Sequence, residues 1–368
     1  MKNRLLSLLL VFVSMVTFAQ ENMKIKGYIK GLSPKAKISF SSLNGEIKVP
    51  TKGGHFEIVQ HLDKEPMFVH LYVKDGNIYT YVSFFVGNET VEITTSLKDL
   101  KKGVKAVGSK YDDKRYEYDL LTNELKATSK KLSEECSNLH GKEGVDVSVL
   151  FDKYYSKVEP KGKIVVVEDK LKQIEYSFLE KNINTAYGRY LLPSTKDKFS
   201  AGQFKKLYDL VDAKYYNTNE VQYLNTLITY KPLQIGDKYY DFTALNMAGK
   251  EVHFSDFFKG KYVLLDMSAN SYLSGDYIET IMGNVPELYR DQMTYVSYYI
   301  FDKLDGMNDY YKNTPAVNML WNKEEKGVTA KYRQGALSYY MLFDPQGKLV
   351  GVLEDFLDKS QLDTWLNK

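Results

Sequence analysis

The first third of the chain alternates polar and apolar residues over short segments. This period of two is found at residues 24–29, 38–41, 46–49 and 90–93. Alternate side chains of a strand point to opposite faces, so the pattern predicts half-buried strands. Turn-forming sequences such as Asn44-Gly45 and Asp75-Gly76-Asn77 separate the apolar runs. We expect a small antiparallel β-sandwich over residues 20–109.

From about residue 111 the apolar period becomes three or four, which predicts amphipathic helices. The first apolar stripe consists of Tyr118, Leu121, Leu125, Thr128, Leu132, Cys136 and Leu139. Further helices are expected around 167–183, after the capping-box spacing of Ser200 and Gln203, and near 219–229. Proline disfavours helix at the residue before it, so Lys231-Pro232 marks the end of this part. The pattern indicates a helical connector over residues 110–232.

The last third alternates between strand and helix signals. The expected order is a hairpin (242–245 and 251–254), a buried strand (263–267), a helix (276–290), a strand (294–301), a helix (309–320), an antiparallel pair (339–343 and 349–353) and a terminal helix from residue 360. This order predicts an α/β domain over residues 233–368. The fold class is therefore multi-domain: an all-β sandwich, an α-helical connector and a C-terminal α/β domain.

The N-terminus has the three parts of a secretory signal peptide. Lys2 and Arg4 precede an apolar run from Leu5 to about Val16, and Thr17-Phe18-Ala19 offers a small-residue cleavage site. The apolar run is shorter than the ~20 residues of a transmembrane helix. We expect cleavage of residues 1–19 after Ala19 and export to the periplasm. No cysteine follows the cleavage site, so a lipid anchor is not expected.

Charge and motif content exclude several function classes. The formal net charge is +3, and removal of the first 19 residues leaves +1, which disfavours nucleic-acid binding. The five histidines show no paired ligand spacing, so neither a metal nor another cofactor is expected. Neither a phosphate-binding loop nor a Gly-x-Ser-x-Gly nucleophile motif is present.

The chain has one cysteine, Cys136, and therefore no intramolecular disulfide. Its position on the apolar stripe favours a small buried side chain. A reactive lone thiol or an intermolecular bridge is the alternative.

Residues 235–276 resemble the opening segment of a thioredoxin-like domain of the thiol–disulfide interchange and peroxiredoxin types. Gly260-Lys261 and the strand 262–267 match the family pattern, but Tyr272-Leu273-Ser274-Gly275 occupies the place of its Cys-x-x-Cys motif. The resemblance implies a thioredoxin fold with an additional N-terminal hairpin.

Two further family features can be located by residue. The position of the family's cis-proline falls on Ser338, and the buried strand carboxylate of the family is retained as Asp266. Asp266 is either a perturbed acid or base under a former active site, or a strand residue satisfied by local hydrogen bonds.

The β-rich segment has a weaker resemblance to a domain of unknown function that precedes thioredoxin-like domains in Gram-negative envelope proteins. The matching residues are Gly27, Gly31, the segment 54–57 and the run 84–93 ahead of Gly108-Ser109. This resemblance implies a fold and a domain neighbour, and no activity.

Thiol exchange needs an attacking thiolate and a resolving thiol, and the degenerate motif supplies neither. The sequence therefore favours an exported, redox-inactive protein that binds or scaffolds an envelope protein or an extended peptide, rather than an enzyme. Tyr272 and Tyr339, with Tyr239-Tyr240, either line a binding groove or fill the space left by the lost active site. The alternatives are a thiol–disulfide oxidoreductase that uses Cys136 or an external thiol, and a purely structural component of a larger complex.

Overall fold

The computed structural model describes residues 22–42, 45–267, 285–299, 314–321, 327–334, 339–353 and 359–366. The chain forms two compact units, Met1–Ile174 and Glu175–Lys368. The boundary falls inside one long helix, so the predicted helical connector contributes to both units. The expected signal peptide lies outside the described residues. No helix in the described ranges is both long enough and apolar enough to cross a membrane.

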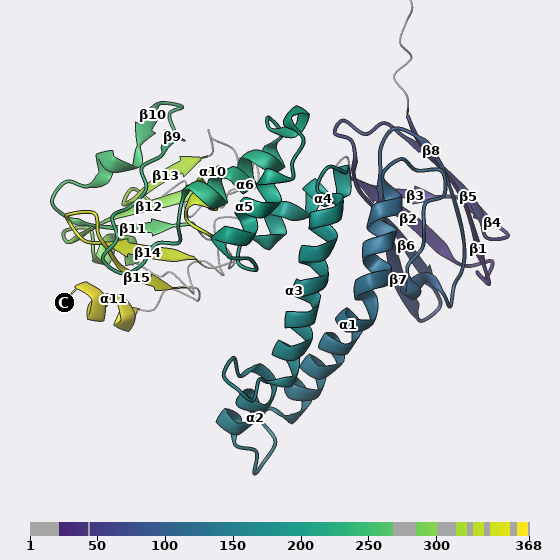
Figure 1. Ribbon diagram of the computed structural model, residues 1–368, viewed down its shortest axis with the longest axis horizontal. Helices are drawn as coiled ribbons and strands as arrows, with labels where there is room; N and C mark the ends of the chain where they lie inside the picture. The colour runs from purple at the N-terminus through teal and green to yellow at the C-terminus, as the bar shows by residue number, and fades with distance from the viewer. Residues whose placement is uncertain are drawn as a thin grey trace, which may run out of the picture. The chain divides into compact units, whose positions relative to one another are not determined.

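The first unit begins with a β-sandwich (Figure 1). Its strands are β1 (Met23–Lys30), β2 (Lys37–Ser42), β3 (Gly45–Val49), β4 (Thr51–Lys52), β5 (His55–Gln60), β6 (Met67–Asp75), β7 (Ile78–Val86) and β8 (Thr90–Ser96). One sheet has the order β4-β5-β1-β8 and the other has the order β3-β2-β6-β7. Buried residues from the inner faces of both sheets, such as Ile25 and Phe40, form one core. The predicted sandwich is present.

The expectation of a wholly antiparallel sandwich is wrong in one place. β1 pairs with β5 antiparallel but with β8 parallel. These two strands lie far apart in sequence, and the direction of such a pairing cannot be read from local alternation. Local alternation also predicts no strand at β6 and β7, because many of their outward-facing residues are aromatic and obscure the period of two.

The helical part follows the sandwich. Its elements are η1 (Leu100–Lys102), α1 (Asp112–Leu139), α2 (Val147–Tyr155), α3 (Lys163–Asn182), α4 (Ala186–Leu191), η2 (Leu192–Thr195), α5 (Ala201–Asp209), η3 (Ala213–Tyr215) and α6 (Asn219–Thr229). α5 begins at the predicted capping box, in which the Ser200 side chain accepts a hydrogen bond from the Gln203 amide and the Gln203 side chain accepts one from the Ser200 amide.

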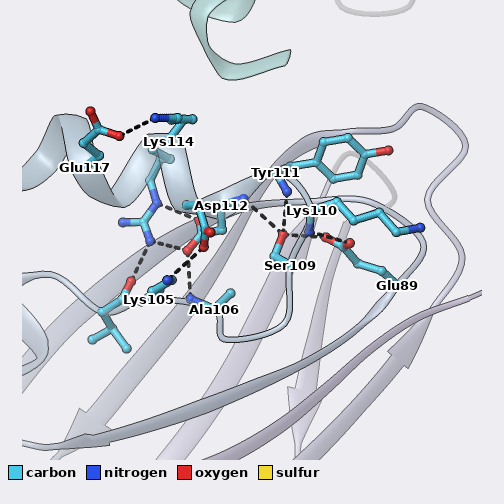
Figure 2. A network of polar contacts seen from close by, with 12 residues as sticks. Glu89, Lys105, Ala106, Ser109, Lys110, Tyr111, Asp112, Lys114 and Glu117 are labelled. Carbon is cyan, nitrogen blue, oxygen red and sulfur yellow. Dashed lines mark hydrogen bonds and ion pairs between the residues drawn. The ribbon is translucent and has the colours of Figure 1, made fainter. Parts of the chain in front are cut away.

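A buried ion pair fixes the start of α1 against the sandwich. The Asp112 carboxylate accepts hydrogen bonds from the backbone amides of Phe85 (2.9 Å) and Ala106 (2.8 Å), and from the Arg115 guanidinium at 2.6–2.7 Å. Burial alone lowers the pKa of Arg115, but its hydrogen bonds and ion pairs with Asp112 and Asp119 together outweigh burial and raise it. Figure 2 shows Asp112 beside Ala106 and Ser109 in this network.

The second unit contains a seven-stranded sheet with the order β10-β9-β13-β12-β11-β14-β15. Its elements are β9 (Thr243–Asn246), β10 (Glu251–His253), η4 (Phe254–Phe257), β11 (Tyr262–Asp266), α8 (Val285–Leu288), β12 (Met293–Tyr299), β13 (Val317–Trp321), α10 (Gly327–Lys331), β14 (Tyr340–Phe343), β15 (Leu349–Leu353) and α11 (Lys359–Leu366). β11 and β12 are parallel, while β14 pairs antiparallel with both β11 and β15. This connectivity is that of a thioredoxin-like fold, with the β9–β10 hairpin added as the resemblance implies.

The sheet is covered on both faces. Leu264 and Tyr295 belong to the core on one face, and Val263 and Val296 belong to the core on the other. A strand buried on both faces is a continuous apolar run, which is how residues 263–267 were recognised.

The helix expected over residues 309–320 is wrong at its C-terminal end. Residues 317–321 form β13, which is parallel to β12 and antiparallel to β9. An interior strand has apolar residues on both faces, and a short run of that kind cannot be distinguished from a buried helical turn by its period. Residues 309–313 lie outside the described part of the chain. So do residues 276–284 of the other expected helix, of which α8 is the described part.

Candidate functional site

β11 ends at a buried carboxylate. Asp266 is the last residue of this strand and is 1% exposed. It lies opposite Ser297 in the parallel ladder with β12 and opposite Tyr340 in the antiparallel ladder with β14. β11 is therefore an interior strand, and Asp266 has a neighbouring strand on each side, β12 and β14.

Two hydroxyl groups of β12 hydrogen-bond to Asp266. The Tyr295 Oη donates to Asp266 Oδ2 at 2.8 Å, and the Ser297 Oγ donates to the same oxygen at 3.3 Å. Tyr295 and Ser297 are two residues apart on one strand, so their side chains lie on the same face. A buried polar group is costly unless it is hydrogen-bonded, and these two donors bond to the Oδ2 atom of Asp266. This is the arrangement expected of a strand residue held by local hydrogen bonds.

The segment after Asp266 is tied to Tyr339. The Met267 amide donates a hydrogen bond to the Tyr339 carbonyl oxygen at 2.9 Å, which extends the β11–β14 ladder by one residue. The structure therefore brings together Asp266 and Tyr339, two of the residues singled out in the sequence. The others, Tyr272, Leu273, Ser274, Gly275 and Ser338, lie outside the described residues, so their grouping stays a prediction.

Tyr339 lies in the protein core. Its side chain is 4% exposed, and its hydroxyl donates a hydrogen bond of 2.8 Å to the Tyr332 carbonyl oxygen. The sequence left open whether this tyrosine lines a groove or fills space. At this position the geometry favours space filling, because a buried ring with a satisfied hydroxyl offers no surface to a ligand.

Tyr332 is a core residue that the sequence analysis missed. Its hydroxyl donates to the Tyr240 carbonyl oxygen, and the Tyr240 hydroxyl in turn donates to the Lys231 carbonyl oxygen at 3.0 Å. Burial raises the pKa of Tyr332 well above its ordinary value, so the phenol remains a neutral donor. These bonds connect the segment around α10 to the segment that precedes β9. No periodic signal marks Tyr332, since it follows a short helix.

Arg333 has a strained backbone, with a φ of 55° in the left-handed region. Its guanidinium donates to the carbonyl oxygens of Leu227 (2.6 Å) and Tyr230 (3.0 Å) at the C-terminal end of α6. A cation at this end of a helix satisfies carbonyl groups that have no partner within the helix. Burial lowers the pKa of Arg333. These contacts hold the chain shortly before the position of Ser338.

Cys136 lies in the first unit, on α1. It is buried and packs with Leu150 and Tyr154 of α2 and Ile164 of α3. The expectation of a small buried side chain is confirmed. Beside it, the Tyr154 hydroxyl donates a hydrogen bond of 2.5 Å to Glu135, which raises the pKa of Tyr154 to about 12 and lowers that of Glu135.

Sequence reasoning could have placed Tyr295 and Ser297 beside Asp266. Both belong to the segment expected to be a strand at 294–301, and the thioredoxin order places that strand next to β11. Among the residues that the structure describes, no cluster of three or more His, Cys, Asp or Glu side chains could hold a metal ion.

No protein-family model matches this chain, and no curated protein matches it. Several solved structures are similar to part of the chain. The thioredoxin domain of a thiol-disulfide oxidoreductase from Bacteroides vulgatus is 20% identical, with a TM-score of 0.31, and the match covers 37% of this chain and 99% of that domain.

Two other similar structures come from other bacteria. The peroxidoxin BcpB from Mycobacterium tuberculosis is 16% identical, with a TM-score of 0.31, over 37% of this chain and 95% of that one. An exposed lipoprotein thioredoxin from Streptococcus pneumoniae is 20% identical, with a TM-score of 0.27, over 35% of this chain and 98% of that one. None of the three matches covers more than 37% of this chain.

Proposed function

We propose that this protein is an exported, redox-inactive thioredoxin-like protein that acts as a binding or scaffold module in the cell envelope. The observation that carries the proposal is the position of its only thiol. Cys136 is buried on α1 in the first unit, whereas the thioredoxin-like sheet belongs to the second. The sequence at the place of the redox motif, residues 272–275, contains no cysteine.

Disulfide exchange requires two thiols that act in turn. The first thiolate attacks the substrate disulfide and releases one substrate sulfur as a thiolate; a second thiol then attacks the mixed disulfide and releases the other. A single buried cysteine cannot complete this cycle by itself. Asp266, whose family counterpart assists the resolving thiol, is instead hydrogen-bonded to Tyr295 and Ser297.

An extended polypeptide is the ligand class that we propose for the second unit. In the sequence Tyr272 follows β11 and Ser338 precedes β14, and the end of β11 at Asp266 pairs with the start of β14 at Tyr340. Tyrosine provides a large contact area and loses little rotamer freedom on binding. Tyr339 is buried, so Tyr272 is the residue on which this proposal is tested.

The redox part of the proposal is tested by insulin reduction with dithiothreitol as the electron donor. We expect the mature protein to precipitate insulin no faster than dithiothreitol alone, with an active thioredoxin as the positive control. Turnover above this background that is lost in Cys136→Ser would favour the oxidoreductase alternative and overturn the proposal.

The binding part is tested with reduced, carboxymethylated α-lactalbumin, which is an unfolded polypeptide without free thiols. We expect the mature protein to bind it and Tyr272→Ala to weaken that binding about tenfold, the effect of removing one aromatic anchor. Tyr190→Ala is the matched control, because Tyr190 is 47% exposed in the same unit. Equal affinities of wild type and Tyr272→Ala would overturn the peptide proposal.

A further inference from the structure

The outer face of the sheet β3-β2-β6-β7 carries a regular array of side chains. Val69, Leu71 and Val73 of β6 are buried in the sandwich core. The alternate residues of β6, including His70 and Tyr72, therefore point away from the core. The strands that carry this face are seen in Figure 1.

Aromatic rings form a ridge over β6 and β7. Tyr79 and Tyr81 are 66% and 58% exposed. The Tyr72 ring centroid lies 5.7 Å from that of Tyr81 and 6.3 Å from that of Tyr79, and the Tyr72 and Tyr79 planes differ by 15°. Three neighbouring tyrosines thus present a partly exposed aromatic surface.

A hollow lies beside this ridge. The next strand, β2, places Ser39 opposite Tyr72 and Ser41 opposite His70, so small side chains stand next to large rings. The hollow has a volume of about 510 Å³, within the range of small-ligand pockets. Its lining side chains include Ser39, Tyr72 and Tyr79, together with Lys37, Glu46, Lys48 and Lys74.

The charges around the hollow are unbalanced. Lys37 and Lys74 are directly opposite each other across β2 and β6, and like charges in such a pair destabilise a sheet. Lys48 lies opposite Ser39 on the neighbouring strand. Within the described part of the chain, none of these lysines forms an ion pair. Three lysines against one glutamate, Glu46, create a local excess of positive charge on a chain that is nearly neutral as a whole.

We propose that this hollow binds an acidic oligosaccharide of uronic-acid type. The apolar C–H face of a pyranose ring packs against tyrosine rings, here Tyr72 and Tyr79. The sugar carboxylates are attracted by the surrounding lysines, and the sugar hydroxyls find hydrogen-bond partners in Ser39 and Glu46. The site belongs to the first unit, so it is independent of the function proposed for the thioredoxin-like unit.

Two other anionic polymers fit the face less well. The residues that line the hollow come from β2, β3, β6 and β7; of these, β2 and β6 are each paired on both sides, so their backbone groups are not available to an added peptide strand. A nucleic acid needs many neutralised phosphates for tight binding, whereas this hollow has three lysines on a chain that is nearly neutral as a whole.

The test is calorimetric titration of the mature protein with oligogalacturonate and oligomannuronate, with methyl-esterified oligogalacturonate as the uncharged match. We expect at least one of the acids to bind and the ester to bind about tenfold more weakly or not at all. Added salt should weaken the binding of the acid, because the lysines are exposed to solvent.

Variants locate the site. We expect Tyr79→Ala to weaken binding about tenfold and Lys74→Gln to weaken it about threefold, in line with an exposed charge pair. The matched controls are Tyr28→Ala and Lys26→Gln on the outer face of the opposite sheet, which should bind like wild type. Thermal melting of each variant establishes that it is folded.

Several outcomes would overturn the proposal. They are the absence of binding to both uronates, equal affinity for the methyl ester, and equal weakening by the control variants. Tighter binding of poly-glutamate or of a single-stranded oligonucleotide than of either uronate would assign the face to a different ligand class.

Discussion

The Tyr295 hydroxyl donates a hydrogen bond of 2.8 Å to the Asp266 carboxylate, and both side chains are buried. The bond joins the two parallel strands at the centre of the thioredoxin-like sheet. It also gives a hydrogen-bond donor to a carboxylate that is buried at the end of β11.

Removal of this donor should destabilise the protein. We expect Tyr295→Phe to lower the free energy of unfolding by about 1–3 kcal/mol, because a buried carboxylate loses a hydrogen bond. Ser297→Ala should cost less, since its bond to the same oxygen is longer, at 3.3 Å. Urea unfolding of the full chain measures both. A smaller effect of Tyr295→Phe than of Ser297→Ala would contradict this account of Asp266.

The buried pair of Asp112 and Arg115 gives a second prediction. Asp112→Ala should lower the free energy of unfolding by about 3–5 kcal/mol, because it removes one of the two counter-ions of a buried guanidinium (Asp119, at 2.7 Å, is the other) and leaves two backbone amides without their acceptor. Removal of both charges in Asp112→Ala/Arg115→Ala should cost less than the sum of the two single substitutions.

The matched control for this pair is Lys114→Gln. It breaks the Lys114–Glu117 ion pair, which is exposed, and should change stability by about 0.5 kcal/mol or less (Figure 2). Denaturant unfolding followed by circular dichroism compares the variants. Additive effects at Asp112 and Arg115 would show that the two residues act independently.

The hydrogen bond between Tyr154 and Glu135 predicts a pH dependence. It lowers the pKa of Glu135 below 4.5, so the stability that Glu135 contributes is present above that pH and is lost as the pH falls. It raises the pKa of Tyr154 from 10.0 to about 12, so the contribution of Tyr154 is present below pH 10 and is lost as the pH rises toward 12.

Tyr154→Phe tests this coupling. We expect the pKa of Glu135 to rise toward its ordinary value, as measured by NMR titration of the glutamate carboxyl carbons. Tyr155→Phe is the control, because the neighbouring Tyr155 is 40% exposed. If the Glu135 titration is the same in Tyr154→Phe and wild type, its pKa is set by the nearby lysines instead.

Gly351 provides a steric prediction. A Cβ atom at this residue of β15 would lie 2.3 Å from the Trp365 indole ring of α11. Gly351→Ala should therefore displace Trp365 and lower the free energy of unfolding by about 1–3 kcal/mol, the usual cost of overpacking. Trp365 fluorescence and urea unfolding together measure the effect.

Gly202→Ala is the matched control. Gly202 lies in the first turn of α5, and its nearest neighbour for an added Cβ is the Ser200 hydroxyl oxygen at 4.0 Å. Alanine favours helix over glycine, so this variant should be as stable as wild type or up to about 1 kcal/mol more stable. Equal losses at Gly351 and Gly202 would contradict the steric explanation.

Local signals in the sequence accounted for a large part of the fold. Ser200 and Gln203 formed the capping box that their spacing predicted, and the apolar run around Val263 became the central strand β11. These features depend on interactions between residues close in sequence or on burial of a whole segment, and both leave a readable pattern. The absence of a second thiol is likewise a property of composition alone.

The buried face of α1 shows what such patterns miss. The sequence placed Leu121 and Thr128 on the apolar stripe, yet both are exposed, while Arg115 and Thr122 are buried. Hydrogen bonds from Phe85 to Asp112 and from Arg115 to Val104 set which face of α1 packs against the sandwich. The period of the helix by itself does not reveal such bonds to other segments.

By itself the sequence determined that the chain has a single cysteine, outside residues 272–275, and it predicted most of the strands and helices that the structure describes. Tertiary structure alone decided the parallel pairing of β1 with β8, the burial of Tyr339 and the donors of Asp266. It also decided that Tyr72 and Tyr79 stand beside three lysines. The physical reason is that strand pairing and side-chain packing join residues that are distant along the chain. These interactions therefore produce no periodic pattern in the local sequence.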